Sequence, residues 1–362
     1  MTRGISKDKD GGAARLCTPV ADWPAKDREI WQSALTKGTP FDDNGARAKL
    51  RPITNRGVEK GYGRWLDFLA RHDPASLAAP AATRITRARV RAYIAGLMDS
   101  GNHLATIGLR VEHLRSAARV VEPSSAWDWL KTPARNLRTR SQPQRDKRER
   151  LVAAADLTRL GVTLMEEAPQ QARPGHAAVH FRDGLIMALL ISVPVRLKNL
   201  SELTLGATLR KIEGRWLISL PGSETKTHKP YEVGWPDHLV EPLEQYLAVW
   251  RPLLAGRRRT SPIPAGDWLW ISAEGRPLSA KRINHAIKLR TEAAFGRRVN
   301  PHLFRDAAAT SMAIGDPANI GVMTAVLGHA TPATMERHYQ QASSLQAQRA
   351  YAQGLASLRG DL

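Results

Sequence analysis

Apolar residues recur at helical spacing through residues 51–130. The stretch Thr54–Leu69 places its apolar side chains on one face, and Thr86–Met98 and Ala105–Val121 repeat the pattern. Trp127–Leu130 fits a short last helix. The pattern predicts a small, all-helical domain over residues 51–130.

In the second half of the chain, apolar residues follow helical spacing in some stretches and strand-like alternation in others. His176–Ser192 is a strongly apolar helical stretch, whereas Arg215–Leu220 and Lys229–Trp235 alternate like strands. Pro221–His228 lies between these strands, so a β-hairpin with Lys226 near its tip is expected. Further helices are predicted at Leu157–Glu167, Lys198–Leu203, Leu239–Leu254, Ala280–Phe295, His302–Ile314, Ala318–Leu327 and from Thr331 onward, with a short strand at Trp268–Ile271. The fold class is therefore mainly α, with a small antiparallel β-sheet or hairpin in the second half.

Two polar segments flank the first helical region. Residues 1–50 begin polar and glycine-rich, which predicts a partly ordered N-terminal arm. Residues 131–150 hold eight basic and two acidic residues with two prolines, which is the composition of a linker. We expect this basic linker to lie along an anionic partner or to be a solvated tether.

Charge narrows the class of partner. The 362 residues include 54 Lys and Arg against 34 Asp and Glu, a net charge of +20 that favours nucleic acid as the partner. The single cysteine, Cys17, excludes an internal disulfide. The first 20 residues show no signal peptide, and the longest aliphatic run, Leu185–Val193, is too short to span a bilayer. We expect a soluble, cytoplasmic protein that does not contact a membrane.

Most of the candidate catalytic residues lie between Asn300 and Gln340. This segment holds His302, Arg305, His329 and Tyr339. His302 and Arg305 are three apart on a predicted helix and share a face. An arginine offers a planar fork of donors that fits two phosphate oxygens, and Arg196 from a distant segment is the second candidate for such a site.

Tyr339 is the natural nucleophile in this set. A free tyrosine has a pKa of about 10, so it needs nearby positive charge or a base. His302 and His329 can serve either purpose, and Lys226 can deliver a proton to a leaving alcohol. No carboxylate cluster of the two-metal type occurs in this segment. His176 and His180 are four apart on a predicted helix, but no third metal ligand accompanies them, so no metal or other cofactor is expected.

Four segments together resemble the tyrosine recombinase (phage integrase) family. HLFRDAAAT is similar to that family's His-x-x-Arg helix, and LGHATPATMERHY to its Leu-Gly-His segment followed by the nucleophilic tyrosine. VPVRLKNLSELTL resembles the segment with the first arginine, and ETKTHKPYEV the lysine hairpin. The chain departs from the family where Pro194–Val195 replace a common Gly or Thr, and where Asn199 replaces an acidic residue.

The resemblance implies a role for each site residue. The phosphate ligands are Arg196, Arg305 and His329. Lys226 is the general acid, His302 is a base or a further ligand, and Tyr339 forms a 3′-phosphotyrosine. These roles imply a site-specific recombinase that cleaves and rejoins DNA without metal or ATP.

The resemblance also implies an organisation. Residues 51–130 would be a core-binding-like DNA-binding domain, residues 151–342 the catalytic domain, and residues 343–362 a tail that docks on a neighbouring protomer or on its own domain. The expected partners are double-stranded DNA, further copies of the chain in a tetramer on two DNA sites, and accessory DNA-bending or directionality proteins. Two alternatives stay open: a DNA-relaxing enzyme similar to type IB topoisomerases, and a non-catalytic architectural DNA-binding protein.

Overall fold

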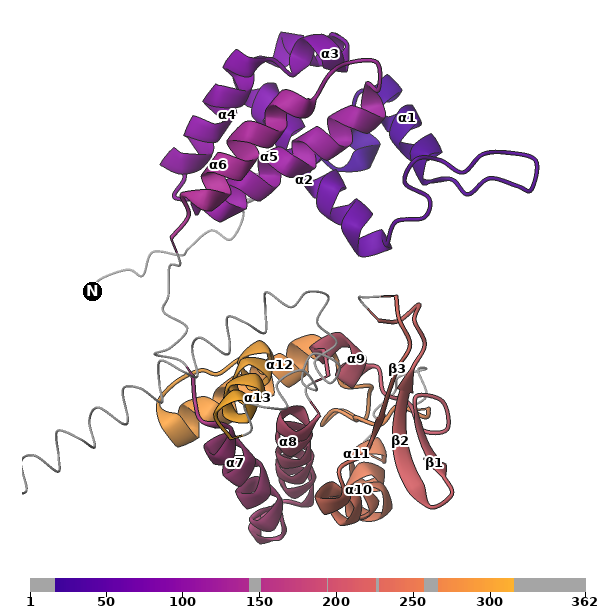
Figure 1. Cartoon of the computed structure of the whole chain (residues 1–362), viewed down its shortest axis with the longest axis vertical. Helices are drawn as coiled ribbons and strands as arrows, with labels where there is room; N and C mark the ends of the chain where they lie inside the picture. The colour runs from indigo at the N-terminus through magenta and orange to yellow at the C-terminus, as the bar shows by residue number, and fades with distance from the viewer. Residues whose placement is uncertain (1–16, 143–150, 194, 226–227, 257–265, 316–362) are drawn as a thin grey trace, which may run out of the picture. The chain divides into compact units, whose positions relative to one another are not determined.

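The structure is a computed structural model that describes residues 17–142, 151–193, 195–225, 228–256 and 266–315. The chain divides into two compact units, Met1–Gln144 and Arg145–Leu362 (Figure 1). Each unit has its own hydrophobic core.

The first unit is helical throughout its described part. Its α-helices are α1 (Ala25–Leu35), α2 (Pro52–His72), α3 (Ala81–Arg84), α4 (Arg87–Asp99), α5 (Leu104–Val121) and α6 (Lys131–Thr139), with short 3-10 turns η1 (Val20–Asp22), η2 (Pro74–Ala78) and η3 (Asp128–Leu130). The helix α2 packs along α5, and Trp65 and Leu114 are fully buried between the elements of this core. At the start of α4, the Thr86 hydroxyl accepts a hydrogen bond from the Arg89 amide, which is the usual N-cap arrangement.

The N-terminal segment is not a separate arm over its described residues. Trp23 and Trp31 are buried in the core of the first unit. The buried Asp27 carboxylate accepts hydrogen bonds from Arg84 at 2.5 and 2.7 Å and from the Tyr62 hydroxyl at 2.7 Å. The ion pair joins α1 to α3 and the Tyr62 hydrogen bond joins α1 to α2, so this part of the predicted, partly ordered N-terminal arm packs on the helical unit. Residues 1–16 lie outside the described part.

The prediction of a linker over residues 131–150 was wrong for its first half. Residues 131–139 form α6, which packs against α5 and buries Ala134 and Leu137. A carbon added at Gly108 of α5 would lie 2.8 Å from the Ala134 carbonyl oxygen, so the helices approach closely. The sequence did not predict this helix, because only two of its side chains are buried and the rest of the segment has the basic, proline-containing composition of a linker. Residues 143–150 lie outside the described part.

The second unit is built around one apolar helix. Its helices include α7 (Ala154–Glu166), α8 (Pro174–Ser192), α9 (Leu197–Ser201), α10 (Val240–Gln245), α11 (Arg251–Ala255), α12 (Ala280–Phe295) and α13 (Pro301–Gly315), with 3-10 turns η5 (Ala168–Gln170) and η6 (Asp237–Leu239) and a π-helical segment η7 (Tyr246–Trp250) between α10 and α11. The helix α8 is buried on nearly all sides by α7, α11, α12 and α13 (Figure 1). A helix that is apolar all round is stable only when covered in this way.

The small sheet contains three antiparallel strands in the order β1 (Leu209–Ile212), β2 (Arg215–Leu220) and β3 (Tyr231–Gly234). The β2–β3 pair confirms the predicted hairpin, while β1 was not predicted. Residues 268–271 were predicted as a strand but form only two isolated bridges, Thr204 with Trp268 and Ile271 with Pro277.

The observed architecture confirms the predicted fold class, which is mainly helical with a helical N-terminal unit and a small antiparallel sheet in the second. Among the described helices, none combines the length and apolar character needed to cross a bilayer.

Candidate active site

Arg196 stands at the point where the chain leaves α8 and enters α9. It occupies the N-cap position of α9 in an extended conformation, next to the buried Val195. Its side chain is half-buried.

Arg305 lies one turn into α13. Pro301 opens this helix, and the Asn300 carboxamide oxygen accepts hydrogen bonds from the amides of His302 and Leu303 at 2.9 and 3.2 Å. This cap fixes the first turn, in which His302 is exposed and Arg305, three residues later, is only 7% exposed. The predicted His-x-x-Arg helix is therefore present, with the arginine buried and the histidine open to solvent.

The two arginines lie close enough to influence each other. Burial and, after it, the nearby positive charge of Arg196 lower the pKa of Arg305 to about 10, while Tyr231 and Asp306 oppose the change. At neutral pH Arg305 remains a cation. The fold thus holds two guanidinium groups together in a partly desolvated place, which is an arrangement suited to an anion.

The loop between β2 and β3 is attached to the helix that Arg196 caps. The buried Asn199 of α9 donates a hydrogen bond from its carboxamide nitrogen to the Glu224 carbonyl oxygen at 3.1 Å. Within the loop, the Thr225 hydroxyl donates to the Lys229 carbonyl oxygen at 2.7 Å. Asn199 stands where the family has an acidic residue, and here it connects this loop to α9.

The described residues account for three of the six predicted site residues. Arg196 lies near enough to Arg305 for its charge to lower the pKa of Arg305, and His302 lies one turn before Arg305 on α13. Lys226, His329 and Tyr339 lie outside the described residues, as do the helices predicted at 318–327 and from 331 onward and the tail at 343–362.

One residue of this site was missed. Tyr231, the first residue of β3, is half-buried and its hydroxyl is influenced by both Arg305 and Arg196. The sequence placed it correctly in a strand, but the alternation of a strand does not reveal which distant charges its side chain meets.

Of the two histidines on α8, His180 makes a structural contact and His176 is exposed. His180 and Arg290 of α12 form a short hydrogen bond, and Arg290 also donates to the Asp183 carboxylate at 3.1 Å. Within the described ranges, no three His, Cys, Asp or Glu side chains gather closely enough to hold a metal ion.

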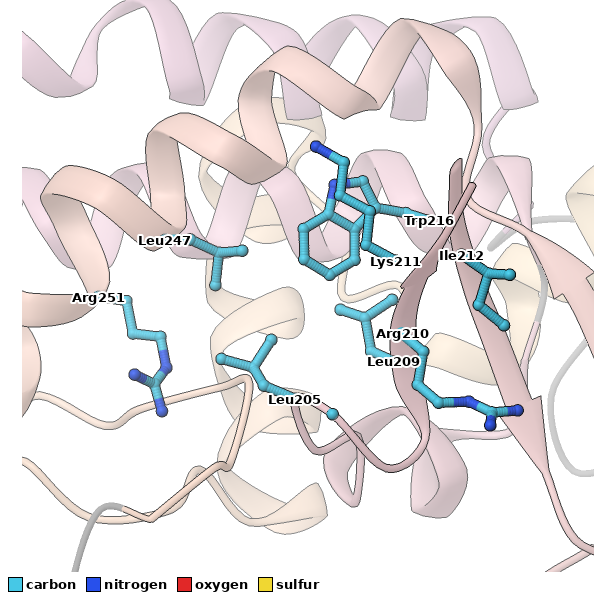
Figure 2. A pocket seen from close by; sticks show the side chains of 9 residues that line it. Leu205, Leu209, Arg210, Lys211, Ile212, Trp216, Leu247 and Arg251 are labelled. Atoms are coloured by element: carbon cyan, nitrogen blue, oxygen red, sulfur yellow. The ribbon is translucent and has the colours of Figure 1, made fainter. Parts of the chain in front are cut away.

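A second surface feature lies beside the edge strand β1. This groove has a volume of about 510 Å³. Its apolar wall includes Trp216, Leu205 and Leu247, whose side chains are drawn in Figure 2. Two of its basic side chains are engaged by the protein: Lys211 pairs with Glu244 at 2.7 Å, and Arg251 donates to the Trp268 and Gly266 carbonyl oxygens. Arg196, His302 and Arg305, the predicted site residues that the structure describes, do not line this groove.

Comparison with known proteins assigns the family. The model of the phage integrase family matches residues 162–345, a region that contains all six predicted site residues. The chain belongs to the phage integrase family. The region between the first arginine and the tyrosine is thus the part of the chain that carries the family relationship.

Two curated relatives and one solved structure are consistent with this assignment. The tyrosine recombinases XerC of Pseudomonas syringae pv. syringae (strain B728a) and pv. tomato (strain ATCC BAA-871 / DC3000) are each 30% identical over 150 residues, which is 41% of this chain and 44% of theirs. The match therefore spans less than half of either relative. The Tn1549 transposon integrase (residues 82–397), solved in complex with circular intermediate DNA, superposes with a TM-score of 0.52 at 13% identity, over 91% of this chain and 99% of that one. At this identity the superposition shows a shared fold.

Proposed function

We propose that this integrase-family protein is a site-specific DNA recombinase that breaks and rejoins strands through a covalent 3′-phosphotyrosine, without metal or ATP. The observation that carries the proposal is the pair Arg196 and Arg305, held together in a partly buried place of a family member. Lys226, His302, His329 and Tyr339 complete the set in sequence order.

The proposed reaction conserves the energy of the phosphodiester. The Tyr339 oxygen attacks the phosphorus and loses its proton, the bond from phosphorus to the 5′ oxygen breaks, and Lys226 protonates the departing 5′-hydroxyl. His302 acts as the base or as a phosphate ligand, and His329 as a further ligand. Attack by a 5′-hydroxyl on the phosphotyrosine reverses each step and reseals a strand.

The electrostatics of the arginine pair suit this chemistry. Two neighbouring, partly desolvated cations raise the free energy of the unbound protein. Binding of an anion between them lowers it again. The five-coordinate transition state carries one more negative charge than the phosphodiester. Donors fixed in advance around that charge stabilise it more than they stabilise the ground state.

The proposed partner is double-stranded DNA. A net charge of +20 supports many phosphate contacts, and the Tn1549 integrase with the same fold was solved with DNA. Recombination between two sites further implies a tetramer of this chain. Accessory DNA-bending or directionality proteins are compatible with such an assembly.

The function is tested by strand exchange. DNA covalently attached to the protein in its host is recovered and sequenced, and two duplexes of different length carrying that sequence are incubated with the protein in EDTA. We expect hybrid-length products with the wild-type chain and none with Tyr339→Phe, which keeps the ring and removes the nucleophile.

Each other outcome favours a different function. Relaxation of supercoiled DNA of any sequence without exchange would support an enzyme similar to type IB topoisomerases. If Tyr339→Phe matches the wild-type chain in every activity, an architectural DNA-binding protein is the better account.

A further inference from the structure

The connection between α1 and α2 presents an aromatic side chain to solvent. Phe41 is 98% exposed, more than any other large apolar residue in the described part of the chain. Figure 1 shows this connection as a loop that extends away from the helices of the first unit. Leu50, which precedes α2, and Ile53, in its first turn, are also exposed. Exposed apolar side chains that gather in one segment are typical of a surface that binds a partner.

Residues 36–45, the 36–45 loop, are held in shape by their own hydrogen bonds. The Thr39 hydroxyl accepts from the Phe41 amide at 3.3 Å and donates to the Asp42 carboxylate at 2.5 Å. The Gly38 amide donates to the Asn44 side-chain oxygen at 3.3 Å. A carbon added at Gly38 would lie 2.3 Å from the Asp42 carbonyl oxygen, so the two sides of the loop approach closely. Because the loop has a defined shape, binding through Phe41 has a reduced entropic cost.

The charge of the 36–45 loop narrows the class of partner. Asp42 and Asp43 follow Phe41 directly, and both are exposed. Carboxylates beside the aromatic ring repel phosphates, so this loop is poorly suited to DNA. A surface that combines apolar and basic side chains would fit it, and a chain with a net charge of +20 is rich in basic surface.

The groove beside β1 has this complementary character. Its wall contains the apolar side chains of Trp216, Leu205 and Leu247, and its volume of about 510 Å³ is large enough for an aromatic side chain (Figure 2). Arg210 and Ile212 also line it, and both are exposed on β1, which lies at the edge of the sheet. The groove therefore offers an apolar surface next to an exposed cation.

We propose that the 36–45 loop of one copy of this chain docks in the groove of a second copy, with Phe41 against Trp216 and Asp43 facing Arg210. An aromatic anchor in an apolar pocket, with opposite charges beside it, is typical of a specific protein–protein contact. Because the loop and the groove are different surfaces, the contact is heterologous and repeats from copy to copy until a ring closes. The inference goes beyond the proposed recombination, since it does not depend on attack by Tyr339.

Cross-linking between two single-cysteine proteins tests the contact. One protein carries Pro40→Cys, next to Phe41, and the other, lengthened by a tag, carries Ile212→Cys in the groove. Both also carry Cys17→Ser, which removes the native thiol, and Tyr339→Phe, which keeps the result independent of DNA cleavage. The two are mixed on long duplex DNA, which raises the local concentration of the copies, and treated with a short bismaleimide. We expect a cross-linked pair that contains one chain of each length.

Two further substitutions should lower the yield of this pair. Phe41→Ala in the loop protein removes the anchor and should lower the yield roughly 10-fold. Because Phe41 is 98% exposed, this substitution should leave folding unchanged. Arg210→Glu in the groove protein places like charges together and should lower the yield about 3-fold.

Leu253→Cys is the matched control for the groove position. Leu253 and Ile212 are both 42% exposed, but Leu253 is not among the residues that line the groove. A protein with Leu253→Cys in place of Ile212→Cys should therefore cross-link to the Pro40→Cys protein only at the background level.

Several results would overturn the proposal. Equal yields with Ile212→Cys and Leu253→Cys, or a yield that Phe41→Ala leaves unchanged, would show that the contact is not specific. A chain with both Pro40→Cys and Ile212→Cys that cross-links only within itself would exclude a second copy. Absence of the cross-link together with weaker DNA binding by Phe41→Ala would assign the loop to DNA. Failure of the proposed recombination would change none of these results.

Discussion

Arg305 shows how a single residue can be unfavourable for the fold and useful for the chemistry. Its guanidinium group is 7% exposed, and both burial and Arg196 lower its pKa to about 10. Because this value is below that of an arginine in an unfolded chain, the unfolded state holds the proton more tightly, and folding is penalised at neutral pH. The penalty disappears only as the pH rises through about 10 toward the unfolded value.

Removing this charge should therefore stabilise the free protein. We expect Arg305→Met, which keeps much of the side-chain volume, to raise the free energy of unfolding by about 1 kcal/mol at neutral pH. Arg210→Met, on the exposed position of β1, is the control and should change stability by less than about 0.5 kcal/mol. Added inorganic sulfate should raise the melting temperature of the wild-type chain more than that of Arg305→Met. A less stable Arg305→Met protein that responds normally to sulfate would refute this view of the arginine pair.

At the scale of elements, one hydrogen bond connects the two parts of the site that the sequence keeps apart. Asn199 of α9 holds the Glu224 carbonyl oxygen, two residues before Lys226. An acidic side chain at this position could not donate to a carbonyl. The departure from the family at Asn199 therefore comes with a direct connection between the loop and α9.

Asn199→Ala tests this connection. We expect the cleavage rate to fall about 10-fold, because the loop that precedes Lys226 loses its hydrogen bond to α9. Affinity for DNA should change little. Ser219→Ala, which removes a hydrogen bond to Glu232 on the exposed side of the same hairpin, is the control. Equal effects of the two substitutions on the cleavage rate would show that general loosening of the hairpin, and not the contact with α9, is responsible.

Elements with a wide buried face could be predicted from the sequence, and those with a narrow one could not. The helix α12 was predicted with its observed bounds, and its apolar positions Ile283 and Ile287 recur at helical spacing. The helix α6 buries only Ala134 and Leu137, so its basic surface dominated the pattern. The strand β1 buries only its first residue, Leu209, and shows no alternation. In both cases neighbouring elements, which local sequence does not specify, decide the structure.

At the scale of the whole molecule, the sequence supplied the residue types of the site and their order, but not their surroundings. Four motifs identified the family, and the family model confirms it over residues 162–345. The burial of Arg305 and the effect of the Arg196 charge on its pKa depend on how the helices pack, which the local sequence does not specify. The net charge of +20 indicated the class of partner but none of these contacts.

The central claim is that Tyr339 becomes covalently joined to the 3′ end of a DNA strand. The most direct measurement is mass spectrometry of the trapped adduct after digestion with nuclease and trypsin. Trypsin cleaves after Arg337 and Arg349, which releases a peptide whose single tyrosine is Tyr339. The account predicts this peptide with the added mass of a nucleotide 3′-phosphate on Tyr339. A nucleotide found on another residue, or no modified peptide from DNA that the protein has cleaved, would contradict it.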